Sequence, residues 1–500
     1  MIPLYLPGSV RAMDERAIAG GTPSLELMER AAGHLARAVT AAAGRSYGLR
    51  VAVLCGKGNN GGDGLAAARR LLDAGAAPLV WLAAAPEELS RDAAAQLARW
   101  RAAGGRVAAS AADALRDADV AVDCLLGTGA AGAPRGAVAG AIAAVTASGL
   151  PVVACDAPSG VDASTGQVAG PAVRADVTVT LGAEKLGLRL WPARGLCGRL
   201  LHADIGVRNS GDAPDAVVLE DADVAALLPA PEPDADKRSR GIVLIVAGSD
   251  GMAGAAVLAA RGALASGAGL VTVMAPEPVR PLIAQAVPAA LTVALPHDPG
   301  HAADLVNERA ADSDAAVFGP GRGRGDADVA LARAVVAGCA APLVLDADGL
   351  NAYRHDGDAL AGHASRLLVC TPHRRELERL TGEEDVWARR AAAAPELAAR
   401  WDTVLVAKGP GTVTAAPGGR RWVNATGSAS LATGGTGDVL AGVLGALLAR
   451  SPRPETVAAG VHLHGLAGEA AARERTVRGA GPVDVVRGLS EAWRRLEAAA

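Results

Sequence analysis

Short apolar runs alternate with alanine-rich helical stretches in the first part of the chain. The runs are of strand length, and the stretches between them are long enough for crossover helices. This alternation predicts an N-terminal α/β domain of Rossmann-like type, built on a doubly wound parallel sheet. Two earlier helices are predicted at 11–19 and 24–43, and we expect them to pack across the edge of the sheet or against a partner subunit. The predicted strands are 51–55, 79–82, 120–124, 152–155 and 177–181.

The alternation then stops in a stretch rich in Asp, Pro and Ala that begins at Arg208 and contains one short helical segment near 221–228. It restarts beyond that stretch, which predicts a second α/β domain. A short hairpin is expected at 412–423, and three helices are expected after Gly435. The later strands are predicted at 242–247, 270–274, 315–318, 343–345, 367–370 and 403–407.

Length and charge bound the organisation of the chain and its partners. A chain of 500 residues exceeds what one hydrophobic core usually organises. We therefore expect an N-terminal domain at 1–207, a linker at 208–221 and a C-terminal domain at 222–500. The net charge of -4 and the pI near 6.2 provide no basic field for nucleic acid or for an anionic membrane, so we expect small-molecule substrates.

The cysteines and the N-terminus favour a cytoplasmic protein. The six cysteines are far apart, have no Cys-x-x-Cys spacing, and mostly fall in or beside strand-like runs. They are predicted to be reduced core residues, and neither disulfides nor zinc ligands. The N-terminus lacks a basic start followed by an apolar segment, and no apolar run is long enough to cross a membrane.

Two glycine-rich segments carry the first chemical signal. The segment 433–438, TGGTGD, runs directly into a helical stretch at 439–449, and the segment 59–64, NNGGDG, follows a strand and precedes a helix. Glycines let the backbone approach an anion, a helix N-terminus adds partial positive charge, and Asp438 can take a proton from an attacking hydroxyl. The simpler interpretation is an ordinary turn with a helix cap. Two such segments in one chain indicate two sites.

Polar residues at three further strand ends point to a cation site in the first domain. Asp123 ends one predicted strand, the segment 127–134 follows it, and Asp156 and Ser159 follow the next. The carboxyl ends of neighbouring parallel strands line one crevice, and oxygens from Asn and Ser with one carboxylate suit a hard cation. The alternative is that each Asp caps a turn.

Four segments, in order over residues 1 to about 207, resemble the NAD(P)H-hydrate epimerase family: RAMDERAIAGGTPSLELMERAA, NNGGDG, DCLLGTGAAGAPRG and DAPSGVDASTG. The resemblance implies that Asn60, Asp123 and Ser159 hold a potassium ion and that Asp156 is the proton-transfer residue. Relatives often carry larger side chains at Ala130 and Ala131. The implied substrate contacts are Asn59, Asn60, Gly61, Gly62, Asp63, Gly127, Thr128, Gly129, Ala130, Ala131, Gly132, Ala133 and Asp156.

The second half carries groups suited to phosphoryl transfer. Backbone N–H groups at 435–437 can hold developing negative charge, the segment 408–412 can grip a nucleotide phosphate, and Asp438 can deprotonate an alcohol. The motif is not a P-loop, which needs Gly-Lys-Ser/Thr after a strand. Taken alone, His373 is more often a turn or cap residue, and Lys408 is more often solvated.

The ordered set of motifs over about residues 222–500 resembles the ADP-dependent NAD(P)H-hydrate dehydratases, which belong to the ribokinase-like superfamily. The resemblance implies ADP as phosphoryl donor together with Mg²⁺. The stretch 373–376 carries Arg where relatives often have Gly. The implied contacts with the hydrated dinucleotide are Ala255, Gly321, His373 and Asp438, and those with the adenine nucleotide are Lys408, Gly409, Pro410, Gly411, Thr412 and Gly437.

Together the two resemblances imply an enzyme that repairs hydrated NADH and NADPH. The N-terminal domain would interconvert the R and S hydrates, with K⁺ fixing the loop. The C-terminal domain would phosphorylate the S-hydrate from ADP, so that phosphate leaves in place of hydroxide, and we expect a homo-oligomer. The alternative is a ribokinase-like kinase for a vitamin-precursor alcohol with a non-catalytic N-terminal binding module.

Overall fold

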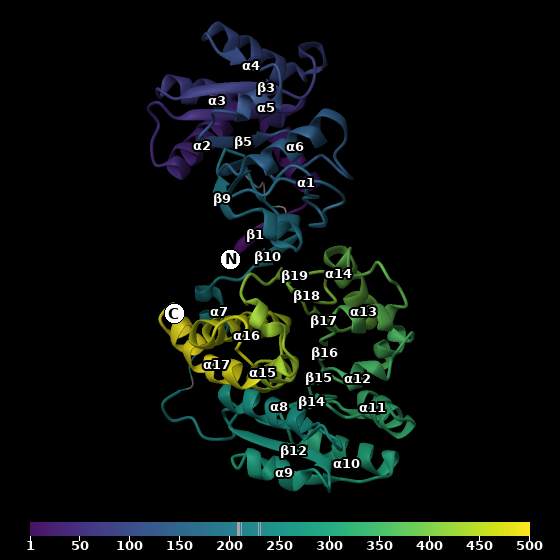
Figure 1. The fold of residues 1–500 in the computed structure, drawn as a ribbon. Coiled ribbons are helices and arrows are strands. Elements are labelled where there is room, and N and C mark those ends of the chain that lie inside the picture. Colours follow the sequence, from purple (N-terminus) through teal and green to yellow (C-terminus); the bar gives the residue numbers. More distant parts are fainter. Residues whose placement is uncertain (208–210, 212, 229, 231) are drawn as a thin grey trace. The chain divides into compact units, whose positions relative to one another are not determined.

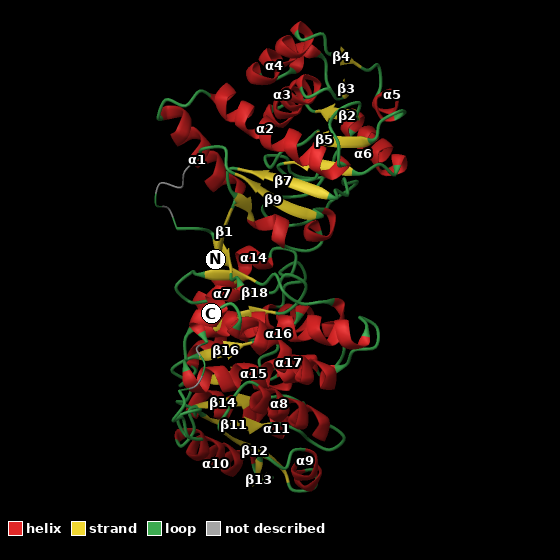
Figure 2. Cartoon of the chain, turned by 90° about the vertical axis from the view of Figure 1, so that its left-hand side faces the viewer, coloured by secondary structure: helices red, strands yellow, loops and turns green. Residues whose placement is uncertain are grey.

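The computed structural model describes residues 1–207, 211, 213–228, 230 and 232–500, and it forms two compact units (Figure 1). The N-terminal unit is Pro3–Ala216, and the C-terminal unit is Val217–Ala500 together with Met1–Ile2. Figure 2 shows that both contain helices and strands throughout, as the predicted α/β class requires.

The predicted linker at 208–221 is not entirely irregular. Residues 208–210 and 212 lie outside the described residues, but the end of this stretch forms a strand, β10 (Ala216–Val218), followed by helix α7 (Asp221–Leu227). Strand β10 pairs in parallel with β19 (Arg421–Val423), through Val217 and Trp422. The sequence missed β10 because a run of only four apolar residues between Asp215 and Glu220 is too short to show a period.

The N-terminal unit contains a parallel sheet in the order β4-β3-β2-β5-β6-β7-β9, and this confirms the doubly wound prediction. All five strands predicted for this unit are present, with small shifts at their ends. Strands β4 and β9 were missed because both are sheet edges with exposed polar residues. Outside this sheet, β1 (Ile2–Tyr5) and β8 (Glu184–Lys185) pair in parallel. The sheet strands are β2 (Arg50–Cys55), β3 (Ala77–Leu82), β4 (Arg106–Val107), β5 (Val120–Cys124), β6 (Val152–Cys155), β7 (Val177–Leu181) and β9 (Arg199–Ala203).

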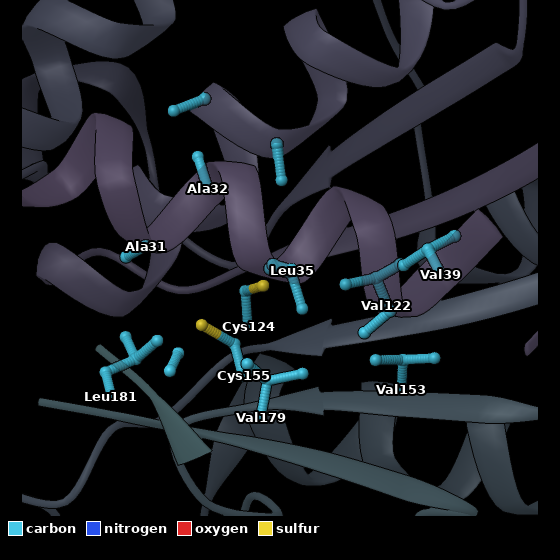
Figure 3. Close-up of a cluster of buried hydrophobic side chains, with 14 of the residues drawn as sticks. Ala31, Ala32, Leu35, Val39, Val122, Cys124, Val153, Cys155, Val179 and Leu181 are labelled. Atoms are coloured by element: carbon cyan, nitrogen blue, oxygen red, sulfur yellow. The ribbon is translucent and has the colours of Figure 1, made fainter. Parts of the chain in front are cut away.

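Helix α2 (Ser24–Ala43) covers one face of this sheet, so the prediction that it packs across the edge is wrong. Figure 3 shows Leu35 and Val39 of the helix facing Val122 and Val153 of the strands, within one buried cluster. The apolar positions of α2 recur at helical spacing and are buried along one side, which suits a face and not an edge. The other helices are α1 (Pro7–Ala19), α3 (Asn59–Asp73), α4 (Arg91–Ala102), α5 (Ala111–Leu115) and α6 (Gly136–Ser148).

The sheet of the C-terminal unit runs in the order β13-β12-β11-β14-β15-β16-β17-β18-β19-β10. It is parallel from β13 to β17, and the predicted hairpin is confirmed as the antiparallel β18 and β19. Strand β13 was missed because it continues an alanine-rich run that resembles a helix. The remaining strands are β11 (Ile242–Val246), β12 (Leu270–Pro276), β13 (Leu291–Leu295), β14 (Ala315–Phe318), β15 (Leu343–Leu345), β16 (Leu368–Cys370), β17 (Val404–Ala407) and β18 (Val413–Ala415).

The three predicted closing helices are present as α15, α16 and α17. None of the helices in the described part of the chain is long and apolar enough to cross a membrane. The helices of this unit after α7 are α8 (Ala253–Ala265), α9 (Arg280–Ala286), α10 (Pro299–Ala311), α11 (Asp326–Gly338), α12 (Asp348–Asn351), α13 (Arg374–Thr381), α14 (Arg390–Trp401), α15 (Thr436–Arg450), α16 (Pro454–Arg475) and α17 (Pro482–Glu497).

All six cysteines are free and buried, as predicted. Four of them lie in strands, and Cys197 and Cys339 follow helical turns. All contribute to cores that contain few aromatic side chains, since aromatic residues make up only 2% of the chain. Small side chains dominate instead, and this allows helices to pack very closely.

Helices α8 and α15 approach each other at glycines. A methyl group added to Gly442 of α15 would lie 1.9 Å from the carbonyl oxygen of Ala259, and one added to Gly262 of α8 would lie 2.5 Å from that of Val439. The backbones therefore touch at a distance that no other residue permits. This contact fixes α15, whose first turn contains Asp438.

Replacing Gly442 by Ala is expected to force α15 away from α8. We expect the C-terminal unit to lose about 1–3 kcal/mol of stability, since overpacking against backbone cannot relax by a rotamer change. Thermal or denaturant unfolding measures the loss. Gly254→Ala, in α8, is the matched control because nothing lies within 4 Å of the added methyl; it should be neutral or slightly stabilising. Equal stability of Gly442→Ala and the parent would contradict the packing argument.

Candidate active sites

The NNGGDG segment is the start of helix α3 and not a loop, so the predicted loop at 59–64 is wrong. The helix begins at Asn59, and its glycines serve packing. A methyl group on Gly61 would lie 2.0 Å from the carbonyl oxygen of Gly56, and one on Gly64 would lie 2.8 Å from the Cβ of Cys124. The first turns of α3 are therefore pressed onto the end of the sheet, which buries the side chains between these glycines.

A cavity of about 810 Å³ opens at the carboxyl ends of the strands in the N-terminal unit. Helix α1 supplies one part of its wall, and α3 and the segment after β5 supply others. Of the sequence-predicted contacts, those that line the cavity are Asn59, Asn60, Asp63, Gly127, Thr128, Gly129, Ala130 and Asp156. Those that do not line it are Gly61, Gly62, Ala131, Gly132 and Ala133.

Asn60, Asp123 and Ser159 lie in one hydrogen-bonded group beneath the cavity. The carboxylate of Asp123 accepts from the Ser159 backbone at 2.7 Å and from the Ser159 hydroxyl at 2.6 Å. The Ser159 hydroxyl accepts from the backbone of Leu126 at 2.9 Å, and Asn60 Nδ2 donates to the carbonyl of the same residue at 2.9 Å. Burial raises the pKa of Asp123, although the donors from Ser159 act against that.

The oxygen Asn60 Oδ1 fits the predicted cation. It is buried and has no hydrogen-bond partner among the residues that the structure describes. A buried amide oxygen without a donor is costly unless a cation or a water satisfies it. This atom, beside the oxygens of Asp123 and Ser159, provides the hard ligands that potassium accepts.

Asp156 is held by a buried lysine that the sequence analysis did not select. Lys185 is 1% exposed, and its ammonium group donates to the carboxylate of Asp156, to Thr180 Oγ1 at 3.2 Å and to the carbonyl of Leu181 at 2.7 Å. Asp156 itself has a φ of 66°, in the left-handed region where Asp is tolerated. Its backbone N–H donates to the carbonyl of Val179 at 2.8 Å, so the turn is fixed.

Two other carboxyl groups that line the cavity, those of Asp63 and Asp14, have raised pKa values. Burial, followed by the negative charge of Asp156, raises the pKa of Asp63 well above its usual range. Burial also raises the pKa of Asp14, against the opposing charge of Lys185. The cavity therefore combines one lysine-paired carboxylate with two carboxyl groups of raised pKa.

In the C-terminal unit, Asp438 lies in the first turn of α15. The helix is preceded by Gly435, whose φ of 95° favours glycine, and a methyl group there would lie 2.7 Å from Leu258. Burial, followed by the charge of Asp346, raises the pKa of Asp438 to about 7. The position of the helix start is supported by His464, whose Nε2 lies 2.9 Å from the carbonyl oxygen of Thr436.

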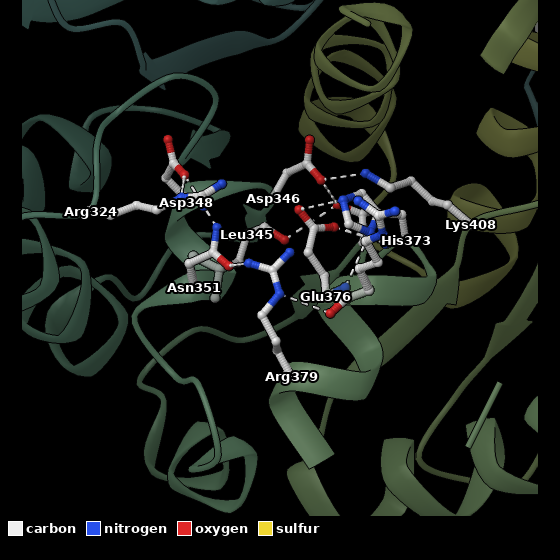
Figure 4. Close-up of polar contacts among 11 residues, drawn as sticks. Arg324, Leu345, Asp346, Asp348, Asn351, His373, Glu376, Arg379 and Lys408 are labelled. Carbon is white, nitrogen blue, oxygen red and sulfur yellow. Dashed lines mark hydrogen bonds and ion pairs between the residues drawn. The ribbon is translucent and has the colours of Figure 1, made fainter. Parts of the chain in front are cut away.

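Lys408 forms an ion pair with Asp346, so the alternative of a solvated lysine is wrong. Its Nζ donates to Asp346 Oδ1 at 2.6 Å, and Thr371 Oγ1 donates to the same oxygen at 2.6 Å (Figure 4). Burial disfavours the charged lysine, but the acidic groups of Asp346, Glu376 and Asp438 together outweigh burial, and the pKa of Lys408 is raised. A methyl on Gly437 would lie 3.4 Å from Lys408 Nζ, so the lysine and the start of α15 are adjacent.

His373 caps helix α13, as the simpler interpretation of this residue suggested. The ring Nδ1 of His373 accepts a hydrogen bond from the backbone N–H of Glu376 at 3.1 Å. The backbone N–H of His373 donates to the carboxylate of Glu376 at 2.8 Å. Burial lowers the pKa of His373, and burial raises the pKa of Glu376 to about 7. The imidazole remains 48% exposed, so capping leaves part of the ring accessible.

Two more of the predicted segments are held by local contacts. Ser249 Oγ donates to the carbonyl of Gly321 at 2.8 Å, and a methyl on Gly321 would lie 2.8 Å from the Cβ of Ala255. The segment 408–412 closes on itself, because Thr412 Oγ1 donates to the carbonyl of Gly409 at 2.8 Å. The loops after β11, β14, β16 and β17 thus present the predicted residues along one end of the sheet.

The comparisons with known proteins cover both units. Residues 24–187 match the family model described as YjeF-related protein N-terminus, and residues 243–490 match the model described as NAD(P)H-hydrate dehydratase. The bifunctional NAD(P)H-hydrate repair enzyme of Moorella thermoacetica is 38% identical over 495 residues, which is 95% of this chain and 93% of that protein. The chain belongs to the family of bifunctional NAD(P)H-hydrate repair enzymes.

Solved structures resemble the dehydratase half of this repair enzyme. A ribokinase-like superfamily protein from Enterococcus faecalis aligns over 58% of the chain and 99% of its own length, with a TM-score of 0.50 and 23% identity, which shows the predicted ribokinase-like fold. The ADP/ATP-dependent NAD(P)H-hydrate dehydratase of Bacillus subtilis, co-crystallised with ATP and Mg²⁺, is 31% identical over 56% of the chain and 99% of its own length, with a TM-score of 0.49.

Three charged residues near the predicted sites of this family member were assigned no role from the sequence. Lys185 and Asp14 belong to segments that read as an ordinary strand end and an exposed helix. Asp346 directly follows the apolar strand β15, and this position was a usable signal, since polar residues at the carboxyl ends of parallel strands line sites.

The neighbouring charge of Asp346 should be measurable in the titration of Asp438. We expect Asp346→Asn to lower the pKa of Asp438 from about 7, because a negative charge beside the buried carboxyl is removed. Infrared difference spectra against Asp438→Asn follow the carboxyl band across pH. Asp348→Asn removes a carboxylate of smaller influence and is the matched control. If Asp346→Asn leaves the pKa of Asp438 unchanged, burial alone raises the pKa of Asp438.

Proposed function

We propose that the two units carry out successive steps of one repair reaction, divided as residues 1–207 and 222–500. The N-terminal unit interconverts the R and S epimers of hydrated NADH or NADPH, and the C-terminal unit dehydrates the S-epimer at the expense of ADP. One observation carries this proposal: the likeness to a bifunctional repair enzyme extends over 95% of the chain and includes both halves.

In the epimerase half, the cavity with Asp156 would receive the nicotinamide end of the hydrate. Asn60, Asp123 and Ser159 would hold K⁺, which supplies a fixed positive charge to the start of α3 and the segment 127–133. Support for this comes from the unpartnered oxygen Asn60 Oδ1. Asp156, held as a carboxylate by Lys185, would accept a proton from the substrate.

In the dehydratase half, Asp438 would remove the proton of the hydroxyl at C6 of the hydrate. The freed oxygen attacks the β-phosphorus of ADP, AMP leaves, and a phosphate ester forms at C6. Phosphate then leaves with its bonding electrons while C5 loses a proton, which restores the C5–C6 double bond. Phosphate is a far better leaving group than hydroxide, and this is the reason for the phosphorylation.

The start of α15 and Lys408 would stabilise the transferring phosphoryl group. The N–H of Gly437 belongs to the first turn of α15, where the helix dipole favours negative charge. Lys408 lies next to it, and the segment 409–412 would hold the rest of the nucleotide. Ala255, Gly321 and His373 would contact the dinucleotide.

Mg²⁺ would be held mainly by the phosphates of ADP. Within the described ranges no three acidic, His or Cys side chains form a metal cage. That arrangement suits Mg²⁺, which keeps several waters and binds through substrate phosphates with few protein ligands. The ion would neutralise phosphate charge.

We also infer a cytoplasmic homo-oligomer that acts on small molecules. The net charge of -4 offers nothing to nucleic acid or anionic lipid, and hydrated nicotinamide cofactors arise where the cofactors are used. Light scattering of the purified chain tests the oligomeric state.

The direct test of the function is the recovery of NADH absorbance. Hydrated NADH, ADP and Mg²⁺ are mixed with the full chain, and the absorbance of NADH should reappear with release of AMP and phosphate. Accumulation of a stable phosphate ester without NADH would instead indicate a simple kinase.

Asp438→Asn should abolish dehydration and leave epimerisation intact. Loss of a general base typically lowers the rate by about a hundredfold to ten-thousandfold. In the parent chain, dehydration should also decline as pH falls through about 7, because protonated Asp438 cannot accept the hydroxyl proton. A variant that keeps more than about a tenth of the parent turnover would remove Asp438 from the base role.

Asp156→Ala should separate the two activities by stereochemistry. Given mixed R and S hydrates with ADP, the parent converts all of the material, since epimerisation feeds the S-form to the dehydratase. The variant should produce NADH quickly, stop once the S-epimer is spent, and continue only at the uncatalysed rate. Adding a separate epimerase should release the remainder. Rapid and complete conversion by the variant alone would refute the role of Asp156.

A further inference from the structure

Four of the charged side chains that line the N-terminal cavity act electrostatically on one another. They are three carboxyl groups and one ammonium group, and the proposed function uses a single carboxylate among them as an acid–base group. Asp14 lies on α1, Asp63 on α3, Asp156 after β6 and Lys185 in β8, and all four line the cavity. Three negative charges beside one positive charge are unfavourable where water is scarce. The two carboxyl groups that receive no hydrogen bond from the lysine accordingly have raised pKa values.

Lys185 determines which carboxyl group stays ionised. A lysine ammonium has three N–H donors, and here they go to Asp156 Oδ1, Thr180 Oγ1 and the carbonyl of Leu181. No donor is left for Asp14 or Asp63. Asp156 Oδ1 also accepts the backbone N–H of Leu181 at 3.1 Å. Two donors on one oxygen, one of them charged, stabilise Asp156 as the carboxylate.

Asp63 is in the opposite situation. Its side chain is 8% exposed, and none of the ion pairs in the described part of the chain includes it. Burial and the charge of Asp156 raise the pKa of Asp63. The glycine contacts hold the start of α3 against the sheet, so the backbone that carries Asp63 is fixed. Asp63 and Asp156 thus face one cavity, one without a cationic partner and the other paired with Lys185.

We propose that Asp63 is a second catalytic residue of the epimerase, the proton donor that works with Asp156, and that Lys185 is the positioning residue of Asp156. This inference rests on the proposed function. In the hydrate, C6 carries both the hydroxyl group and the ring nitrogen N1, so it is a hemiaminal. Asp156 takes the hydroxyl proton and the O–H electron pair becomes the second bond of a C6 carbonyl. The C6–N1 bond breaks, its electron pair goes to N1, and N1 takes the proton of Asp63.

The opened ring then closes on its other face. Half a turn about the C5–C6 bond presents the opposite side of the carbonyl to N1. N1 attacks C6 and returns its proton to Asp63, while the oxygen takes back the proton held by Asp156. Both carboxyl groups end as they began, no co-reactant is consumed, and the C6–O bond never breaks.

The first test measures epimerisation by the full chain without ADP, starting from one epimer and using chromatography. Asp63→Asn should lower the rate by about a hundredfold or more. Asp73→Asn, an exposed carboxylate at the end of the same helix, is the matched control and should keep the parent rate. The inference is overturned if Asp63→Asn keeps more than about a tenth of the parent rate. It is also overturned if Asp14→Asn loses epimerisation and Asp63→Asn does not. A parent chain without epimerisation would contradict the proposed function itself.

Lys185 is tested by the pH dependence of the same reaction. The other charged side chains that line the cavity with Asp156 are Lys185 on β8, Asp63 on α3, Arg11, Asp14 and Glu15 on α1, and Lys57, Glu88 and Arg135 between these elements. Lys185 is the cation that pairs with Asp156. Lys185→Met and the milder Lys185→Gln should therefore slow epimerisation and move the pH below which it declines to a higher value. If these variants lower the rate but leave its pH dependence unchanged, Lys185 has only a structural role. The proposal that it positions Asp156 would then be wrong.

The final test needs no variant. Epimerisation by the parent chain is run in water enriched in heavy oxygen, and the mass of each epimer is followed. Ring opening through Asp63 and Asp156 leaves the C6 oxygen unlabelled while the epimers exchange. Uptake of label in step with epimer exchange would mean that the C6–O bond breaks, and the assigned roles would be wrong.

Discussion

Contact between helix backbone and its neighbours, permitted by glycine, is the constraint on which both candidate sites depend. In the N-terminal unit, Gly61 and Gly64 let the start of α3 rest against the backbone of Gly56 and the side chain of Cys124. In the C-terminal unit, Gly442 brings α15 against Ala259. The helix starts are thereby held at the carboxyl ends of the strands, and their carboxyl groups are removed from water.

Each unit places a buried lysine–aspartate pair beside a carboxyl group that burial keeps close to its neutral form. Lys185 pairs with Asp156 next to Asp63, and Lys408 pairs with Asp346 next to Asp438. Such pairs add little net stability, because desolvation of the two ions offsets their attraction. Their value lies in placing carboxyl groups of different proton affinity within one site, which is what acid–base chemistry requires.

The strands in the middle of each sheet were predictable because parallel strands buried on both faces are continuous apolar runs, as at Val120–Cys124 and Leu343–Leu345. The edge strands β4 and β9 mix polar and apolar residues and were missed. Glycine density made 59–64 read as a loop, since glycine is a poor helix former, but tertiary packing overrides that preference. Motifs located Asp156 after a strand and Asp438 at a helix start, whereas the function of Lys185 depends on its burial, which no local pattern reveals.

The thiols of this chain have a consequence for where it can work. All six are buried, and burial raises the pKa of Cys197 and Cys370 to about 12 and that of Cys339 to about 11. The thiolate is the form that reacts with peroxides and alkylating agents, and at neutral pH these side chains hold almost none of it. The folded enzyme therefore presents no exposed thiol to oxidants.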